Sequence, residues 1–343
     1  MKNFEYANPK TEAEAIELLA VTNKSTAVLA GGTDLVGLMK QMVVSPQRVV
    51  NIADIETMRH IKRDEANNVW VGAAVHLDDF LHSSIADPYP SVKQMILGIS
   101  SIQLQSQGTL VGELLRRPCC WYFRGGADLL AQEGRMVVEG DNRYHAILGN
   151  SGPAKFVSAS RLAPALIALG ARVRIVGPKS DQEEIVAIES LYQTPNRTGD
   201  LETTLIAGQF VTHILFPPDQ GQLSAAYEVR HGEGPDQPMV SAAVSFMLDR
   251  GIICEAKIVL GQVAPMPWVA RKAASAMVGL RVNEETASMA GERAVVGAMA
   301  LSQNEYKIDL TKVAVKRAIL RAVGMDTGGF ESTASESETI SLA

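Results

Sequence analysis

Cysteine is scarce in this chain, and its placement excludes a disulfide-stabilised fold. Only three cysteines occur among 343 residues, and two of them, Cys119 and Cys120, are adjacent. Three thiols cannot build a disulfide framework and are typical of a reducing compartment. A cytoplasmic location is therefore the simpler expectation, and periplasmic export together with a partner that carries a signal is the alternative.

Long apolar runs and an excess of basic residues are missing as well. No stretch of about 18 uncharged apolar residues occurs, and residues 1–10 lack the apolar core of a signal peptide. We therefore expect a soluble chain with no membrane insertion.

The formal net charge is −6, and the Arg116-Arg117 pair is too short a basic run to indicate a nucleic-acid partner. No local grouping of histidine and acidic residues has the spacing of a metal site, so no metal ligand is expected.

The most informative segment is the glycine turn Ala30-Gly31-Gly32-Thr33-Asp34-Leu35. It follows an apolar run at 27–29 and precedes a helix-like run at 36–42. Two glycines let the backbone approach a bound group and turn its amides inward, which suits phosphate, and Thr33 adds a hydroxyl donor. The same pair is also typical of an ordinary tight turn. The local sequence leaves both interpretations open.

The order of the apolar segments predicts an α+β protein with several units. Strands and helices alternate over 1–55, and a second α/β unit is expected over 56–218. An irregular stretch at about 118–140, rich in glycine and charge, is expected to be a long loop insertion. Pro217-Pro218 marks the expected boundary to the next unit.

The third unit, 219–326, has a different order of elements. Three strand-like segments come first, at 225–230, 240–248 and 255–263, and three amphipathic helices follow within 270–323. This order predicts an antiparallel three-stranded sheet with a helical layer on one face. Residues 327–343 are rich in Ser, Thr, Glu and Gly and are predicted to form a disordered tail.

Two further segments, 106–114 and 150–166, carry glycines and hydroxyl side chains that by themselves indicate only turns and helix caps. Together with the glycine turn they resemble the FAD-binding (medium) subunit of the molybdenum hydroxylase family, which includes xanthine dehydrogenase. The likeness runs from about Phe4 to about Gly324. It is strongest to the flavin subunits of aldehyde oxidoreductases and 4-hydroxybenzoyl-CoA reductase, through the stretches 120–125, 144–147 and 163–171.

This resemblance implies a two-part N-terminal FAD-binding α/β domain of the PCMH type and a C-terminal α+β domain. It implies that the turn amides hold the FAD pyrophosphate, that a second loop holds phosphate and ribose, and that further residues lie near the adenosine and the isoalloxazine ring. The residues of these four groups are, in order, Leu29, Ala30, Gly31, Gly32, Thr33, Asp34 and Leu35; Thr109, Gly112 and Glu113; Ser160, Arg161 and Leu162; and Val211 and Tyr227.

Several positions depart from the family pattern. Glu113 stands where asparagine is common, and Arg161 stands where aspartate is frequent. Flavin subunits of the closest subgroup carry a [4Fe-4S] cluster in the loop corresponding to 118–140, but here that loop has only Cys119 and Cys120, which are adjacent. A cluster needs about four converging thiolates, so we predict that it is lost while the loop remains. Cys254 is expected to be a small buried residue.

Two weaker candidates lie beside that loop. His145, in a strand-like run at 144–148, is interpreted as a hydrogen-bonded structural histidine. The aromatic residues at 121–123 suit either a docking surface or an anchor of the loop to the core.

The function implied by the resemblance is electron transfer in a heterotrimeric oxidoreductase. A large partner with a molybdenum cofactor would hydroxylate an aldehyde or heterocycle, a small partner with [2Fe-2S] clusters would carry electrons, and FAD in this chain would pass them to an external acceptor. The redox chemistry belongs to the cofactor, so no catalytic acid or base is expected. A self-contained FAD-dependent oxidase or reductase and a flavin-free scaffold subunit stay open as alternatives.

Overall fold

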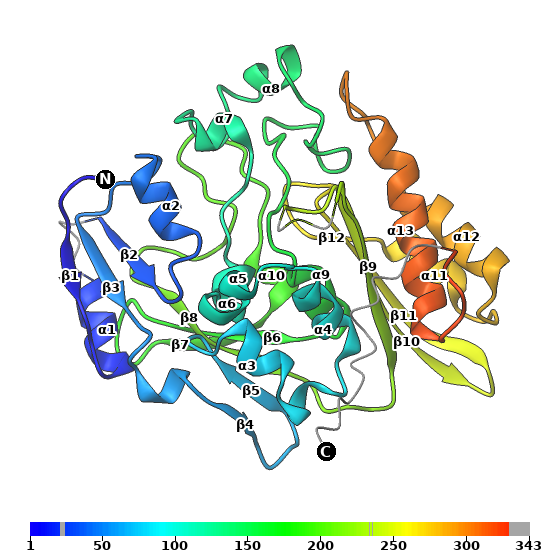
Figure 1. Cartoon of the computed structure of the whole chain (residues 1–343), viewed down its shortest axis with the longest axis horizontal. Coiled ribbons are helices and arrows are strands. Elements are labelled where there is room, and N and C mark those ends of the chain that lie inside the picture. The colour runs from blue at the N-terminus through cyan, green and yellow to red at the C-terminus, as the bar shows by residue number, and fades with distance from the viewer. Residues whose placement is uncertain (21–24, 233, 235, 329–343) are drawn as a thin grey trace, which may run out of the picture.

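The first sheet of the protein is parallel and small. The computed structural model describes residues 1–20, 25–232, 234 and 236–328. Strands β1 (Glu5–Ala7), β2 (Thr26–Leu29) and β3 (Arg48–Asn51) pair in the order β1-β3-β2, and helices α1 (Glu12–Leu19) and α2 (Leu35–Lys40) connect them. The hydroxyl of Thr11 accepts the amide of Glu14 and caps α1. This sheet ends in the glycine turn, which leads from β2 into α2 (Figure 1).

The second sheet is antiparallel, with five strands in the order β4-β5-β8-β6-β7. Its strands are β4 (Ile61–Arg63), β5 (Val69–Gly72), β6 (Arg172–Val176), β7 (Glu183–Ala187) and β8 (Phe210–Phe216). The short helices of this part are η1 (Glu56–Met58), α3 (Leu77–Leu81), η2 (Ser84–Ala86), α4 (Pro90–Leu97), α5 (Ile102–Gln107), α6 (Leu110–Leu114), α9 (Ala163–Ala168) and α10 (Ile188–Leu191). Apolar residues of both sheets and of these helices share one buried core, so the first two sheets are packed as one body.

The expected loop insertion carries two short helices, α7 (Trp121–Arg124) and α8 (Arg135–Glu139), at the top of the view in Figure 1. Phe123, Leu130 and Phe156 form a separate small apolar cluster there, against Leu38 of α2. The strand predicted at 144–148 is wrong, because this segment is a series of turns and bends. The carbonyl groups of Tyr144, His145 and Ala146 instead accept hydrogen bonds from the distant side chains of Asn304 and Lys307.

The third sheet is antiparallel, as predicted, but has four strands in the order β12-β11-β10-β9. The three expected strands are β9 (Leu223–Val229), β10 (Val240–Asp249) and β11 (Ile252–Gly261), and the sequence missed the two-residue β12 (Trp268–Val269). Two residues are too short for a periodic signal. The three expected helices are present as α11 (Arg271–Met277), α12 (Glu284–Ala294) and α13 (Tyr306–Ala322).

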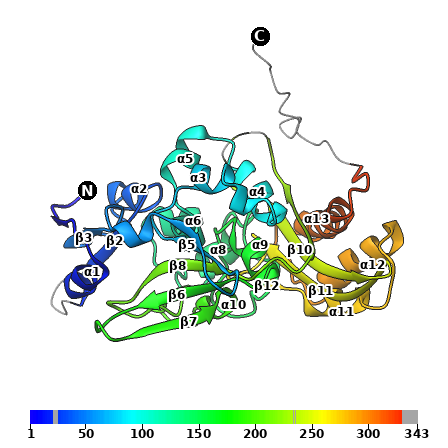
Figure 2. The ribbon, with the colours of Figure 1, turned by 90° about the horizontal axis from the view of Figure 1, so that it is seen from below.

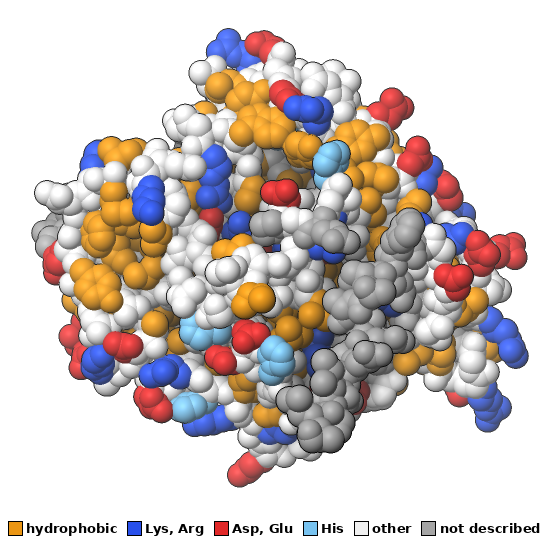
Figure 3. All heavy atoms as spheres, viewed as in Figure 1, with side chains coloured by type: hydrophobic (Ala, Val, Ile, Leu, Met, Phe, Trp, Pro, Cys, Tyr) orange, Lys and Arg blue, Asp and Glu red, His pale blue; other side chains and the backbone are white. Residues whose placement is uncertain are grey.

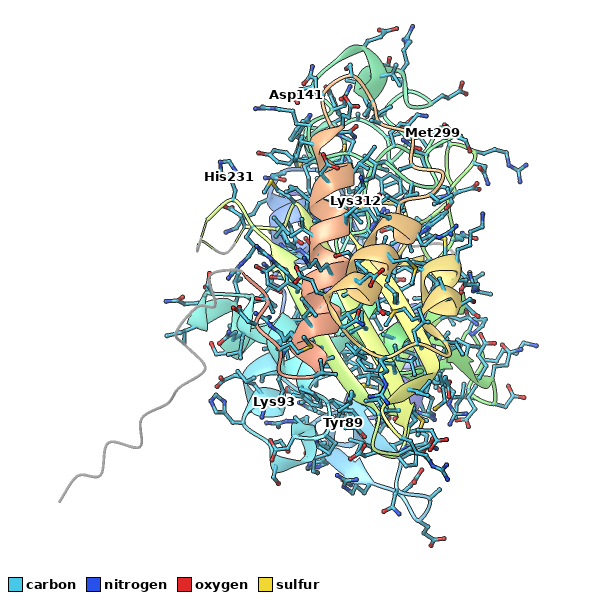
Figure 4. All side chains as sticks on the ribbon, turned by 90° about the vertical axis from the view of Figure 1, so that its right-hand side faces the viewer. Tyr89, Lys93, Asp141, His231, Met299 and Lys312 are labelled. Atoms are coloured by element: carbon cyan, nitrogen blue, oxygen red, sulfur yellow. The ribbon has the colours of Figure 1, made fainter. Side chains whose placement is uncertain are left out.

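These three helices cover the C-terminal sheet on one side. Figure 4 shows α13 crossing the strands beside α12, with Lys312 at their junction, where its ammonium pairs with Glu292 of α12. Helices α4 and α9 of the preceding part contact β9, β10 and β11. Figure 2 shows the result: the three sheets follow one another across the molecule in the order of the chain.

Apolar side chains also reach the surface. Figure 3 shows them gathered at the left edge, over the N-terminal elements, where the exposed large apolar residues of this part of the chain are Met1, Phe4, Tyr6, Val36 and Met42. None of the helices in the described residues combines the length and apolar character needed to cross a membrane. The expected tail lies, from residue 329 onward, outside the described residues.

Candidate functional site

A cavity of about 470 Å³ lies between the first sheet, α2 and the loop that leads into α6. The glycine turn forms one wall, and residues around Thr109 and the start of β8 form the others. Its volume falls within the range of roughly 300–1,000 Å³ that is common for sites of small molecules and cofactors. The residues that line it are 25–35, 38, 44–46, 52, 73, 109, 111, 112, 115, 117, 205 and 209–211.

The glycine turn presents free backbone donors to this cavity. Among the described residues, the amides of Gly31, Gly32, Thr33 and Asp34 have no hydrogen-bond acceptor within the chain. Gly32 has a φ of 72°, a left-handed conformation that glycine adopts without strain. Several consecutive free amides around such a residue form a concave donor surface that suits an anion.

Gly31 is required for a different reason, which is the close approach of two loops. A Cβ atom at this position would lie 1.8 Å from the carbonyl oxygen of Gln107. A Cβ at Gly108 would come within 3.7 Å of the Thr33 hydroxyl, so the glycine turn and the second loop touch directly. The cavity wall is therefore continuous across two loops that lie about 75 residues apart in the chain and that the tertiary fold brings together.

The second loop is organised by a helix cap. The Thr109 hydroxyl accepts the amide of Gly112 at 3.0 Å, which fixes the first turn of α6. This amide is therefore already bonded within the chain. The Thr109 hydroxyl proton stays available to a ligand on this side, beside the surfaces of Val111 and Leu115.

The structure brings most, but not all, of the sequence-predicted site residues together. Those that line the cavity are Leu29, Ala30, Gly31, Gly32, Thr33, Asp34, Leu35, Thr109, Gly112 and Val211. Those outside its lining are Glu113, Ser160, Arg161, Leu162 and Tyr227. The Ser160 hydroxyl accepts the amide of Ala163 at the start of α9, and Tyr227 packs under the guanidinium groups of two arginines of α13.

Sequence reasoning missed part of the wall. The main additions are Ser25, Thr26 and Ser45 from the edges of the first sheet, Arg117 after α6, and Gln209 before β8. For Ser25, Thr26 and Ser45 the sequence offered one signal, which is a small hydroxyl side chain near a strand of the first sheet. Arg117 and Gln209 reach the cavity through tertiary packing, which no local pattern encodes.

The Asp34 side chain points to the loop insertion. Its carboxylate accepts the Arg117 amide at 2.9 Å and pairs with the Arg124 guanidinium at 2.8 Å. Arg124 in turn donates to the carbonyl oxygens of Arg117 and Pro118. Asp34 therefore has two roles. Its backbone faces the cavity, and its side chain binds residues 117–124 of the loop insertion.

The two departures from the family pattern, Glu113 and Arg161, lie in contact. The Glu113 carboxylate accepts the backbone amide of Arg161 at 3.3 Å and pairs with Arg116 at 3.2 Å. The Arg161 guanidinium, fully buried, pairs with Glu228 of β9. The two substitutions therefore belong to one network of opposite charges.

The cysteines of the loop insertion have separate environments. Cys120 is buried with its sulfur 3.2 Å from His145 Nε2, whereas Cys119 is half-buried. Burial raises the pKa of both thiols, which disfavours the thiolate form that binds iron. Cys254, expected to be buried, is instead exposed on β11, because its position in the strand alternates to the outer side. Among the described residues no group of three or more potential ligands is placed to hold a metal ion.

His145 and Lys307 hold the turn segment beside this loop. Burial, together with the nearby Lys307 ammonium, lowers the pKa of His145 to about 4, so the imidazole is neutral near pH 7. Its ring packs edge-on against Trp121 at 5.3 Å. Lys307, fully buried on α13, donates to the carbonyl oxygens of Tyr144, His145 and Gln262, and burial lowers its pKa to about 7. These contacts agree with a structural role for His145.

Comparison with known protein families gives this geometry its context. Residues 2–219 match the family described as the FAD binding domain in molybdopterin dehydrogenase. The chain belongs to this family. Residues 225–322 match the C-terminal domain of the CO dehydrogenase flavoprotein, so the two matches follow each other along nearly the whole FAD-binding chain. The family expected from the resemblance is confirmed.

Individual relatives of the chain are consistent with this family assignment. The FAD-binding chain is 29% identical to the aldehyde oxidoreductase FAD-binding subunit PaoB of Escherichia coli, over 78% of this chain and 84% of the relative. It is 26% identical to the carbon monoxide dehydrogenase medium chain of Afipia carboxidovorans, over 93% and 96%. A solved chain of carbon monoxide dehydrogenase from Hydrogenophaga pseudoflava has the same fold, with a TM-score of 0.73 at 22% identity over 94% of this chain and 98% of that chain. The predicted α+β fold class is confirmed.

The residues of the cavity fit the cofactor of the family. FAD carries a pyrophosphate, and the free amides of the glycine turn offer donors for it with no competing carboxylate, because Asp34 is engaged with Arg124. Apolar side chains such as Leu29, Val111 and Val211 suit the flat rings of this cofactor. When bound, FAD supplies the redox chemistry, and this chain supplies binding and orientation.

Proposed function

We propose that this chain is the FAD-binding electron-transfer subunit of a heterotrimeric molybdenum-containing hydroxylase. It takes electrons from the [2Fe-2S] clusters of a small subunit to FAD and passes them to an external acceptor, while a large subunit carries the molybdenum cofactor. The observation that carries this proposal is the row of free amides from Gly31 to Asp34, which opens on the cavity inside a family match of residues 2–219.

The names of the relatives support the multi-subunit part of the proposal. They include a FAD-binding subunit and medium chains of dehydrogenases, which are parts of larger assemblies. Among the proposed cofactor contacts, the glycine turn and Thr109 bind the pyrophosphate and ribose, and Val211, which lines the cavity, lies near the isoalloxazine ring. Glu113, Ser160, Arg161, Leu162 and Tyr227 contribute from outside the lining. This chain has no proposed catalytic acid or base.

A visible spectrum of the purified full-length chain tests the proposal. Flavin bands that disappear when the protein is denatured and filtered indicate noncovalent FAD and agree with the relay. Flavin retained covalently would favour a self-contained oxidase or reductase. A chain that shows no bands after incubation with FAD would be a scaffold, and the proposal would be wrong.

Isolation from the native source tests the partners. We expect two further chains, with molybdenum and iron found in the complex and flavin found with this chain. Full substrate turnover by this chain alone would contradict the heterotrimer.

Fractionation of the same cells tests the cytoplasmic location that we propose, against co-export to the periplasm. Limited proteolysis tests the proposed units at 1–55, 56–218 and 219–326.

A further inference from the structure

Arg161 is a fully buried arginine that connects two parts of the molecule. It lies just before α9, and only 1% of its side chain is exposed. Its guanidinium donates two bonds to the carboxylate of Glu228 on β9, at 3.0 and 3.1 Å, and a third to the carbonyl oxygen of Asp236 at 3.1 Å. All three acceptors belong to the C-terminal sheet and the loop that follows β9. Such a forked pair fixes orientation as well as distance.

The backbone of the same residue reaches the cavity wall. The Arg161 amide donates to Glu113 Oε1 at 3.3 Å, and Arg116 pairs with Glu113 Oε2 at 3.2 Å. Glu113 directly follows Gly112, which lines the cavity, while Glu113 itself lies outside the lining. A path of covalent bonds and hydrogen bonds therefore runs from Gly112 in the wall of the cavity, through Glu113 and Arg161, to Glu228 in the C-terminal sheet.

The charges of this path balance only while every member is present. Burial raises the pKa of Glu228, and the Arg161 guanidinium opposes that rise. Arg230 stands farther away, with its nearest nitrogen 4.0 Å from Glu228. Because the pair is buried, removal of one partner leaves an uncompensated charge in a poorly solvated place, which is far more costly than loss of an exposed pair. Replacement of Arg161 or of Glu228 by an uncharged residue is therefore expected to shift residues 109–113 relative to β9.

The surroundings leave little room for an alternative arrangement. A Cβ atom at Gly98 would lie 2.3 Å from Glu228 Oε2, so the loop after α4 closes over the carboxylate. Arg230 donates to the carbonyl oxygen of Gly98 and holds that loop in place. Glu228 is thus confined on several sides, and Arg161 is the cation that makes its forked ion pair.

We propose that Arg161 is a positioning residue of the FAD site, which acts through Glu113 on the wall formed by residues 109–112 and through Glu228 on the C-terminal sheet. The inference rests on the proposed function, because it takes FAD as the ligand of the cavity. In this arrangement the C-terminal sheet contributes to FAD affinity although β9 and Glu228 do not line the cavity. The coupling is carried by contacts that exist before FAD binds.

The test compares FAD affinity among full-length variants. R161M and E228Q each break the forked pair, and R161K keeps the charge without the fork. R174M is the control, since it removes a different arginine that is paired with glutamates, here Glu12 and Glu183, and that lies outside the cavity lining. Quenching of flavin fluorescence gives the dissociation constant of FAD, and thermal melting shows whether each variant is folded.

We expect R161M and E228Q to raise the dissociation constant of FAD about ten-fold, a change typical of coupled sites. R161K should lie between them and the unsubstituted chain, and R174M should lower the melting temperature with unchanged affinity. Faster amide exchange at residues 109–113 in E228Q would agree with the path. Folded R161K and E228Q with unchanged FAD affinity would overturn the positioning role alone, whereas absence of FAD binding by the unsubstituted chain would overturn the proposed function itself.

Discussion

The carboxylate of Asp34 and the guanidinium of Arg124 form an ion pair of 2.8 Å that joins the glycine turn to the loop insertion. Both side chains are mostly buried. Because Asp34 also accepts the amide of Arg117, a lining residue of the cavity, one carboxylate fixes the wall of the cavity and the start of the loop together.

Replacement of Asp34 by asparagine should loosen the loop insertion. The amide cannot keep both the charge-assisted bond to Arg124 and the bond to the Arg117 amide, so we expect a loss of about 1–3 kcal/mol in the free energy of unfolding. Amide exchange at 117–126 should become faster. The control is D141N, which breaks the exposed pair with Arg143 and should leave the stability almost unchanged, because exposed ion pairs are weak. Equal exchange in both variants would contradict the link.

Substitution of Gly31 by alanine should abolish tight FAD binding. The new Cβ would stand 1.8 Å from the Gln107 oxygen, so the two loops must separate and the donor surface must change shape. We expect the dissociation constant of FAD to rise more than about ten-fold, since an atom displaced at a binding wall removes several contacts. The control is G37A in α2, where a Cβ meets nothing within 4 Å and alanine should stabilise the helix by up to about 1 kcal/mol. Normal FAD binding by G31A would show that the turn does not carry the site.

Acid should destabilise the protein through His145. Its pKa is lowered from 6.5 to about 4 in the folded chain, so between these values the unfolded chain binds the proton and the folded chain does not. The stability that depends on the neutral imidazole is thus present above pH 6.5 and is lost as the pH falls toward 4, by up to about 3 kcal/mol. Melting temperatures of H145N should fall less over this interval. H60N, which removes an exposed imidazole, is the control, and a slope for H145N equal to that of the unsubstituted chain would refute this assignment.

Lys307 should be essential for the turn segment at 142–150. Replacement by methionine leaves the carbonyl oxygens of Tyr144, His145 and Gln262 without this donor, so we expect a loss of roughly 2–5 kcal/mol, measured by chemical denaturation. K312M provides the comparison on the same helix, because Lys312 makes surface pairs with Glu292 and Asp309, which contribute little to stability. Similar losses in the two variants would mean that the buried ammonium has no special role.

The purified chain should contain flavin but no stoichiometric iron. Cys119 and Cys120 are adjacent, burial raises the pKa of both thiols, and the Cys120 sulfur is engaged with His145. Metal analysis after anaerobic purification measures this directly. The double variant C119S/C120S should keep the same flavin content. Iron at about four atoms per chain, lost in that variant, would show that the predicted loss of the cluster is wrong.

Much of the fold could be predicted because its signals are local. Strands β9, β10 and β11 lie within three residues of the predicted segments, and the three helices after them lie in the predicted range. The segment at 144–148 could not be predicted, because its apolar residues looked like a strand while its backbone bonds to Asn304 and Lys307, about 160 residues later. Propensity reports what a segment prefers, and tertiary partners decide which groups satisfy its backbone.

The sequence by itself determined the order of elements, the glycine turn, and the small number of cysteines, because each depends on residue type and spacing along the chain. Only the tertiary structure decided which predicted residues share the cavity, since Thr109 and Val211 reach it through packing, while Arg161 and Tyr227 are drawn into contacts of the C-terminal sheet. It also decided that Glu113 accepts the backbone amide of Arg161, while the side chains of the two residues pair with Arg116 and Glu228. Charge pairs between distant residues arise from how layers pack, which no local pattern records.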